Sequence, residues 1–195
     1  MITGNVLFLA ANPQSTERLA LDVECRNIDE RLKLGPERPL KFESRWAVRT
    51  IDLQQALLEV APTVVHFSGH GAGTSGIVLA GKDDSAVQHV DGAALRGLFA
   101  AFADTVKVVV LNACWAEAQA QAIVEVVDAV VGMRDAVADE AALAFSLAFY
   151  QALAFGKPVA QAFALGVNQI ELEGLADQRD VPVLLQRKQV TDGGP

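Results

Sequence analysis

The stretch that decides the fold is Thr105-Val-Lys-Val-Val-Val-Leu-Asn-Ala-Cys114. Residues 105–111 include four valines, a residue type enriched in β-strands. They predict a strand that ends in Asn112-Ala-Cys114. A short helix is predicted to follow over Trp115–Ile123, which places Cys114 between a strand and a helix.

Further strands are predicted on both sides of this one. Asn5–Ala11 is a continuous apolar run of strand length, a pattern typical of a strand buried on both faces of a parallel sheet. Thr63–Phe67 predicts another strand, which ends in the glycine-rich segment Ser68–Gly76. Three more strands are predicted, over Leu40–Val48 near a sheet edge, Val126–Val131 and Val181–Leu185.

Helical patterns separate these strands. Ser15 is expected to cap the first helix, whose core-facing residues are Leu21, Cys25, Ile28 and Leu32. A hairpin is expected around Gly81–Asp84, and the longest helices are predicted over Asp139–Phe155 and Pro158–Leu172. Strands that alternate with helices predict an α/β fold: a three-layer sandwich with a mostly parallel central sheet of about six strands, flanked by helices.

The composition bounds the domain count and the class of partner. With 195 residues, the chain is expected to form a single domain over residues 1–190, followed by a disordered tail over residues 191–195. A hydrophobic content of 51% argues against a disordered polyelectrolyte, and a net charge of −8 argues against nucleic-acid binding. The longest apolar stretch, Ala141–Phe155, is shorter than the roughly 20 residues of a membrane span, so no membrane contact is expected.

The two cysteines, Cys25 and Cys114, provide neither a disulfide framework nor a metal cluster. We therefore expect a reducing, cytoplasmic setting, and the cysteine–histidine chemistry predicted below needs no metal and no cofactor. Cys25 is expected in the core.

Chemistry is expected beyond the carboxyl ends of the strands, where ligands bind in open α/β sheets. His70 follows the strand over residues 63–67, and Cys114 follows the strand over residues 105–111. If these strands are neighbours, an imidazole and a thiol come within reach of each other. The amide groups at the start of the next helix favour a thiolate, so the pattern predicts a nucleophilic Cys114 with His70 as its acid/base partner.

Glycines flank the histidine in Gly69-His70-Gly71 and let the backbone bend tightly there. The amides of Gly71 and Cys114 are therefore candidates for an oxyanion site. The same loop also matches a dinucleotide fingerprint in Gly71–Gly76, but a hairpin rather than a helix is predicted to follow. The other histidines are expected to pack in the core (His66) or to lie on the hairpin surface (His89).

Two of these segments, Val65-His-Phe-Ser-Gly-His-Gly71 and Val110-Leu-Asn-Ala-Cys114, resemble the caspase-like peptidases and, within them, the CHAT domains. The histidine and the cysteine are 44 residues apart, close to the caspase spacing of about 50. The similarity extends from Leu7–Pro13 through Val131–Met133 and Phe149-Tyr150 to Pro182–Leu184. It implies a caspase-like sheet and a cysteine endopeptidase in which His70 and Cys114 take the family's catalytic positions.

The resemblance also bears on specificity. Separase and metacaspases cleave after basic residues through an acidic pocket, and Ala136–Asp139 resembles the segment that supplies the acid. Asp139 is the first substrate-binding candidate and Asp135 the second, although Asp139 is equally suited to cap the following helix. Arg134 keeps recognition of an acidic residue open. Caspases carry Gln-Ala-Cys followed by a small or basic residue and Gly, whereas Trp115 follows the nucleophile here and is a third substrate-binding candidate.

Three functions remain open at this point. The first is a cysteine endopeptidase that cuts a protein or peptide substrate after a basic residue. The second is a weakly active or inactive interaction module of a larger signalling or defence system, with regulatory sensor or repeat-containing partner domains. The third is a cysteine hydrolase of small molecules. An inactive precursor that awaits a cut near Lys82 is also compatible with the sequence.

Overall fold

Six strands form one sheet in the computed structural model, which describes residues 1–13, 15–37, 39–81 and 86–187. The sheet has the order β2-β1-β3-β6-β7-β8, and all neighbours are parallel except β7 and β8. Its strands are β1 (Gly4–Ala11), β2 (Leu40–Arg45), β3 (Val64–Gly69), β6 (Val108–Asn112), β7 (Ala129–Met133) and β8 (Pro182–Gln186). The predicted mostly parallel sheet is confirmed.

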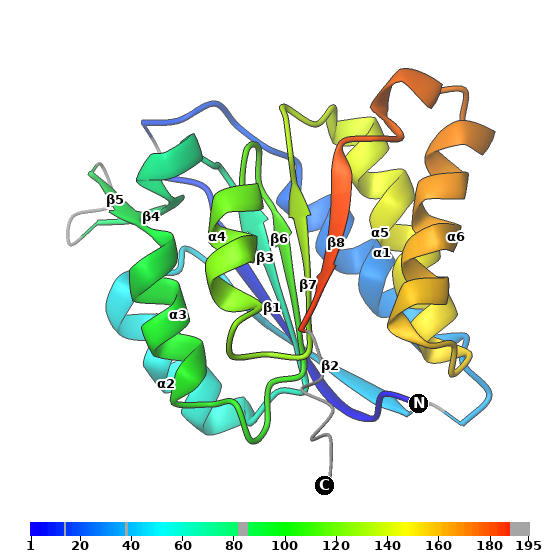
Figure 1. Ribbon diagram of the computed structural model, residues 1–195, viewed down its shortest axis with the longest axis horizontal. Helices are drawn as coiled ribbons and strands as arrows, with labels where there is room; N and C mark the ends of the chain where they lie inside the picture. Colours follow the sequence, from blue (N-terminus) through cyan, green and yellow to red (C-terminus); the bar gives the residue numbers. More distant parts are fainter. Residues whose placement is uncertain (14, 38, 82–85, 188–195) are drawn as a thin grey trace, which may run out of the picture.

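Helices cover both faces of the sheet (Figure 1). One face packs against α1 (Leu21–Lys33), α5 (Asp139–Ala154) and α6 (Val159–Leu172), and the other against α2 (Thr50–Val60), α3 (Gly92–Ala100) and α4 (Glu117–Ile123). Successive β1 residues alternate between these two cores, with Val6 and Phe8 on the α1 side and Leu7 and Leu9 on the α2 side. Because side chains alternate along a strand, a continuous apolar run places apolar side chains on both faces of the sheet, and both faces are buried under helices.

A hairpin of β4 (Ile77–Ala80) and β5 (Val87–Val90) leaves the main sheet after β3, preceded by the short 3-10 helix η1 (Gly73–Ser75). A dinucleotide-binding site requires an α-helix at this position, and the Gly71–Gly76 segment does not begin one. His89 is exposed on β5, as predicted. Lys82, at the predicted processing site, and the predicted tail over residues 191–195 lie outside the described residues.

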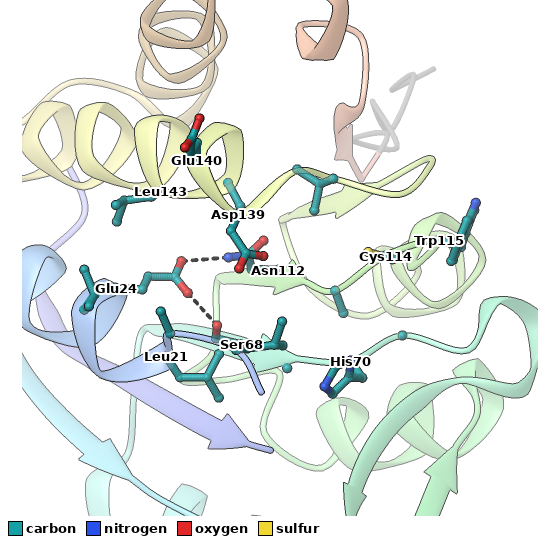
Figure 2. Close-up of a pocket in the computed structure, with 18 residues that line it drawn as sticks. Leu21, Glu24, Ser68, His70, Asn112, Cys114, Trp115, Asp139, Glu140 and Leu143 are labelled. Atoms are coloured by element: carbon teal, nitrogen blue, oxygen red, sulfur yellow. Dashed lines mark hydrogen bonds between the residues drawn. The ribbon is translucent and has the colours of Figure 1, made fainter. Parts of the chain in front are cut away.

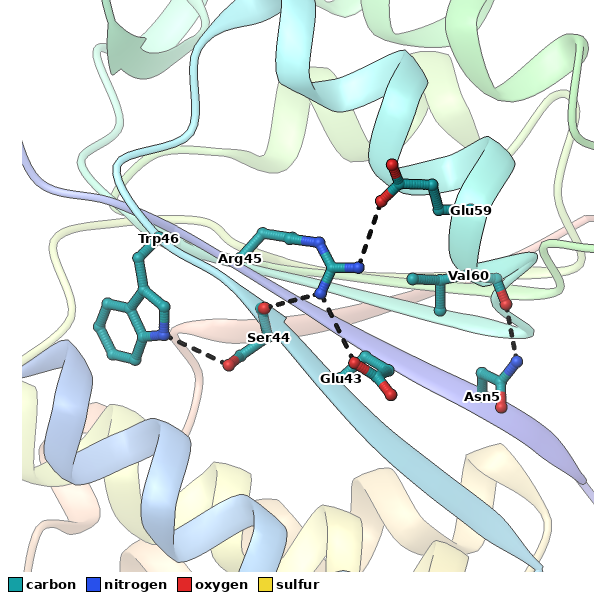
Figure 3. Close-up of polar contacts among 7 residues, drawn as sticks. All are labelled: Asn5, Glu43, Ser44, Arg45, Trp46, Glu59 and Val60. Carbon is teal, nitrogen blue, oxygen red and sulfur yellow. Dashed lines mark hydrogen bonds and ion pairs between the residues drawn. The ribbon is translucent and has the colours of Figure 1, made fainter.

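Polar side chains near the edge strand β2 make the contacts that Figure 3 shows. Arg45 lies 3.5 Å from Glu43 and 3.4 Å from Glu59 on α2, and it donates to the Ser44 carbonyl. Asn5 on β1 donates to the Val60 carbonyl at the end of α2 (2.7 Å). Exposed ion pairs of this kind contribute little stability, but charged side chains on an edge strand oppose pairing with another chain.

The long apolar helix was correctly predicted to be buried in the protein. Phe145, Phe149 and Tyr150 on α5 are fully buried against the sheet. Among the described residues, no helix is long and apolar enough to cross a membrane. The short 3-10 helix η2 (Ala176–Gln178) connects α6 to β8.

The first helix does not begin at Ser15. It begins at Leu21, and its N-cap, Ala20, provides no side-chain cap. Residues 15–20 form a loop instead, in which Thr16 donates to the Pro13 carbonyl (2.7 Å) and Glu17 offers its carbonyl to His70 (2.8 Å). The loop thus connects β1 to His70 before the helix begins.

Candidate active site

A cavity of about 280 Å³ lies beyond the carboxyl ends of β3 and β6 (Figure 2). Its walls come from the loop before α1, from α1 itself, from the two strand ends and from the start of α5. The polar residues that line it are Glu24, Ser68, His70, Asn112, Cys114, Trp115, Asp139 and Glu140. The structure thus brings the predicted dyad, His70 and Cys114, to one cavity, as expected for neighbouring strands.

The strand register explains this arrangement. Ser68 on β3 lies opposite Asn112 on β6, and His70 and Cys114 each follow two residues later. Both side chains are partly exposed, so a molecule in the cavity can reach the imidazole and the thiol.

Two glycines let the backbones approach at this point. A Cβ on Gly69 would lie 2.5 Å from the Ala11 carbonyl oxygen at the end of β1, and a Cβ on Gly71 would lie 1.9 Å from the Cys114 carbonyl oxygen. Real Cβ atoms do not come this close to a carbonyl oxygen. The Gly-His-Gly motif is therefore a packing requirement of the two loops as well as a source of flexibility.

The imidazole of His70 is held by backbone. Its Nε2 donates to the Glu17 carbonyl at 2.8 Å. Because a carbonyl only accepts, a neutral His70 carries its proton on Nε2 and keeps the lone pair on Nδ1. Asn12 supports the same loop. In the amide orientation that satisfies both of its side-chain atoms, the nitrogen donates to the Glu17 carbonyl (3.0 Å) and the oxygen accepts from the Leu19 amide (3.1 Å). The fixed tautomer suits Nδ1 for accepting a proton from a nucleophile.

The two residues that carry the predicted oxyanion amides pack together, since the Gly71 Cβ position is 3.2 Å from the Cys114 nitrogen. Gly71 and Ile77 form an isolated β-bridge, but the residues next to them make its hydrogen bonds. Val78 donates to the His70 carbonyl, and Ala72 donates to the Gly76 carbonyl. Within the described chain, neither the Gly71 amide nor the Cys114 amide donates to a protein acceptor. Both N–H groups are thus available to a ligand.

Trp115 and Asp135 form one unit beside the cysteine. The indole Nε1 donates to the Asp135 carboxylate (2.9 Å), and the Trp115 amide donates to the Asp135 carbonyl (3.2 Å). Trp115 lines the cavity, whereas Asp135 does not. The helix predicted to start at Trp115 starts at Glu117 instead, because Trp115 adopts a left-handed φ of 52°. The seven-residue helix α4 therefore begins three residues beyond Cys114.

The acidic residues at the start of α5 face the same cavity. Asp139 is exposed and is the first residue of α5, whose N-cap is Ala138 without a side-chain cap, so the capping role considered for Asp139 does not occur. Arg134 pairs with Glu117 (3.3 Å) and lies outside the cavity lining. Among the described residues, the lining includes Glu24, Asp139 and Glu140 and contains no Lys or Arg.

Sequence reasoning missed Glu24, which is buried at the back of the cavity. Its Oε1 accepts from Asn112 (2.8 Å) and Ser146 (2.8 Å), and its Oε2 accepts from Ser68 (2.5 Å). His66 Nε2 lies 3.2 Å from Oε1, without hydrogen-bond alignment. The available signal was that Glu24 shares the apolar face of α1 with Leu21 and Ile28.

Burial on its own raises the pKa of the Glu24 carboxyl, but His66 and the donated hydrogen bonds outweigh it and lower the pKa below its ordinary 4.5. Burial, followed by the Glu24 charge, raises the pKa of Tyr150 well above 10. The Tyr150 hydroxyl therefore keeps its proton and can donate it to His66 Nδ1, 2.9 Å away. His66 is fully buried and stacks on Phe8, which confirms the predicted packing role.

No group of three or more His, Cys, Asp or Glu side chains in the described ranges is placed to hold a metal ion. Cys25 and Cys114 are free thiols, and Cys25 is buried as predicted.

Solved structures share this architecture. The chain is similar to the Arg-specific cysteine proteinase gingipain R, with a TM-score of 0.66 and 12% identity over 95% of this chain and 46% of that one. It is also similar to a secreted C11 cysteine protease from Bacteroides thetaiotaomicron in complex with an irreversible peptide inhibitor, with a TM-score of 0.67 and 11% identity over 95% and 66% of the chains. The fold is therefore that of the caspase-like cysteine peptidases.

A curated relative, the Roc-COR-CHAT protease of an unknown prokaryotic organism, is 22% identical over 177 residues. That match covers 87% of this chain but only 17% of the relative, so the chain corresponds to a small part of that protein. The family model named CHAT domain matches residues 7–179. The sequence match, together with the sheet and the cavity at its carboxyl edge, shows that the chain belongs to the CHAT domain family.

Proposed function

We propose that this chain is a cysteine endopeptidase in which Cys114 is the nucleophile and His70 the acid/base. The observation that carries the proposal is that both side chains line one cavity at the ends of adjacent parallel strands, with His70 Nε2 occupied by the Glu17 carbonyl. That contact supplies the third group that orients a catalytic base. The family and the fold support the reaction class.

The reaction begins when His70 Nδ1 accepts the thiol proton of Cys114 and the sulfur attacks the peptide carbonyl carbon. The oxyanion that forms accepts hydrogen bonds from the Gly71 and Cys114 amides, which have no protein partner within the described residues. His70 then gives its proton to the leaving amine as the peptide C–N bond breaks. Water, deprotonated by His70, hydrolyses the thioester and restores the thiol.

We propose that the peptide carries a basic residue on the acyl side of the cut bond. Acidic side chains line the cavity, and Asp139 is exposed there, without a hydrogen-bonded or ionic partner inside the described chain. Asp139 is thus our first candidate for recognising the cation. Trp115 forms an exposed apolar wall beside Cys114, and Asp135 supports it.

The curated relative and the free thiols support proposals about the partner domains and the cellular compartment of this chain. Because the curated relative is much longer and carries Roc and COR in its name, we propose that this domain works beside regulatory partner domains. The free thiols Cys25 and Cys114 suit a reducing compartment such as the cytoplasm.

The direct test uses peptides that differ only in the residue before the cut, Arg, Lys, Leu or Asp, each also prepared as an irreversible acyloxymethyl ketone. We expect cleavage of the Arg and Lys peptides and labelling of Cys114 by the corresponding ketones. Cys114→Ala and His70→Ala should abolish cleavage, while Cys25→Ala should retain it. A folded wild-type protein that cleaves none of the peptides and leaves Cys114 unlabelled would indicate the interaction module instead.

A further inference from the structure

The buried carboxylate of Glu24 connects the two strand ends that carry the dyad. Ser68 donates to it from β3, two residues before His70, and Asn112 donates to it from β6, two residues before Cys114 (Figure 2). Ser68 and Asn112 are also direct partners in the strand register. The Glu24 carboxylate on α1 therefore holds Ser68 and Asn112, each of which comes two residues before one member of the proposed dyad.

The contact belongs to a buried polar network. Ser146 on α5 donates to the same carboxylate at 2.8 Å, and His66, paired with Tyr150, lies against it from β3. Only 6% of the surface of Glu24 is exposed, so this network, rather than water, stabilises its charge. Three donors and the His66 ring occupy most of the roughly four acceptor positions of a carboxylate. Little acceptor capacity is left for a cationic substrate side chain.

We propose that Glu24 is a positioning residue of the active site, which holds the ends of β3 and β6 in register through Ser68 and Asn112 and thereby sets His70 against Cys114. This inference rests on the proposed function and adds a residue to it. Glu24 acts through the strand ends and does not touch the substrate. The recognition of a basic side chain is left to Asp139, whose carboxylate is exposed to the cavity.

Two serine variants offer a matched test. Ser68→Ala and Ser146→Ala each remove one hydroxyl donor from the same carboxylate, but only Ser68 lies on a strand that carries a dyad residue. Both variants lose a buried, charge-assisted hydrogen bond, so both are expected to lower Tm, by roughly 3–10 °C. Only Ser68→Ala is expected to lower kcat, by about tenfold to 100-fold with little change in KM, because small misplacements of reacting groups are costly.

Glu24→Gln separates positioning from substrate recognition. It keeps the length and one acceptor oxygen but removes the charge. We expect a loss of kcat as in Ser68→Ala, with the preference among Arg, Lys, Leu and Asp peptides unchanged. An increase of KM confined to the basic peptides, with kcat preserved, would show that Glu24 binds the substrate and would overturn the proposal. Equal kcat losses in Ser68→Ala and Ser146→Ala would also overturn it, since they would reflect general destabilisation.

A readout without a peptide separates this proposal from the proposed function. The rate at which iodoacetamide alkylates Cys114, followed by peptide mass mapping, reports how well His70 activates the thiol. We expect slower alkylation in His70→Ala, Ser68→Ala and Glu24→Gln than in wild type, and an unchanged rate in Ser146→Ala. If this alkylation pattern is found in a protein that cleaves none of the peptides, the peptidase assignment fails but the positioning role of Glu24 is supported. An unchanged rate in Ser68→Ala and Glu24→Gln contradicts the positioning role, whatever the peptides show.

Discussion

Gly71 packs directly on Cys114, so close that a Cβ on the glycine would lie 1.9 Å from the cysteine carbonyl oxygen. The contact joins the loop that follows β3 to the loop that follows β6. Each of the two residues also carries a backbone N–H group, and within the described residues neither N–H has a protein acceptor. The spacing of the proposed oxyanion site thus depends on the absence of a side chain at residue 71.

Gly71→Ala is expected to push the two loops apart and to remove the Gly71 amide from the oxyanion site. Loss of one such donor lowers kcat by about 100-fold to 1000-fold, and we expect a loss in this range for the best peptide. Steady-state kinetics measure it.

The matched control is Gly97→Ala. Gly97 is an exposed residue of α3, and a Cβ there would meet nothing within 4 Å. Alanine in a helix interior is more stable than glycine by about 0.5–1 kcal/mol, so Gly97→Ala should raise Tm slightly and leave kcat unchanged. If Gly71→Ala retains full activity, the Gly71 amide is not part of the site.

Asp139→Asn tests recognition of the basic residue. The change removes the exposed carboxylate that lines the cavity and keeps its size. We expect kcat/KM for the Arg and Lys peptides to fall by about tenfold. This loss lies between the cost of losing an exposed charge pair and the cost of losing a buried one. Asp135→Asn neutralises an acid four residues earlier that lies outside the lining, so it should leave the preference for basic residues unchanged. The reverse pattern would transfer the role to Asp135.

The order of strands and helices could be predicted because apolar runs and helical periodicity are local signals. Asn5–Ala11, for example, is nearly the observed β1 (Gly4–Ala11), and the helix predicted over Asp139–Phe155 differs from α5 by one residue. The sequence also placed His70 and Cys114 after strand ends, but their location at one cavity was conditional on the two strands being neighbours, which the β3–β6 pairing supplies.

Contacts between distant segments could not be predicted. The Ser15 cap was inferred from a local pattern, but the Glu17 carbonyl bonds to His70 instead. Glu24 looked unremarkable because its partners, Ser68, Asn112 and Ser146, come from three other elements. Local sequence describes the elements well, whereas a buried charge is explained only by what the fold brings to it.

The two cysteines are expected to differ sharply in reactivity. Burial, and then the nearby carboxylates, raise the pKa of the Cys25 thiol above its ordinary 9.0, despite a hydrogen bond with Ser44. Because the thiolate is the reactive form, iodoacetamide at pH 7.5 should modify the partly exposed Cys114 and leave Cys25 intact until guanidinium unfolds the chain. Mass mapping before and after unfolding measures this. Rapid modification of Cys25 in the folded protein would contradict its place in the core.

The charge of Glu24 should make stability depend on pH. Its carboxyl has a folded-state pKa below the ordinary 4.5, so its stabilisation is complete above pH 4.5 and is lost as the pH falls through the folded-state value. Near pH 7, Glu24→Gln should cost about 2 kcal/mol, within the range for losing a hydrogen bond to a buried charged group, because glutamine keeps one acceptor. Urea unfolding of wild type and variant between pH 7 and pH 3 measures the difference, which should shrink below pH 4.5.

Glu59→Gln is the control for this series. Hydrogen bonds from Gln55 and Arg45, and the Arg45 charge, outweigh a small desolvation effect and lower the pKa of Glu59 as well, but its side chain is exposed and its charge is solvated. Its removal should hardly change stability at any pH. A wild-type advantage over Glu24→Gln that stays constant from pH 7 to pH 3 would mean that Glu24 is not ionised in the folded protein. The network would then hold a neutral acid, and the link between β3 and β6 would lose its charge-assisted strength.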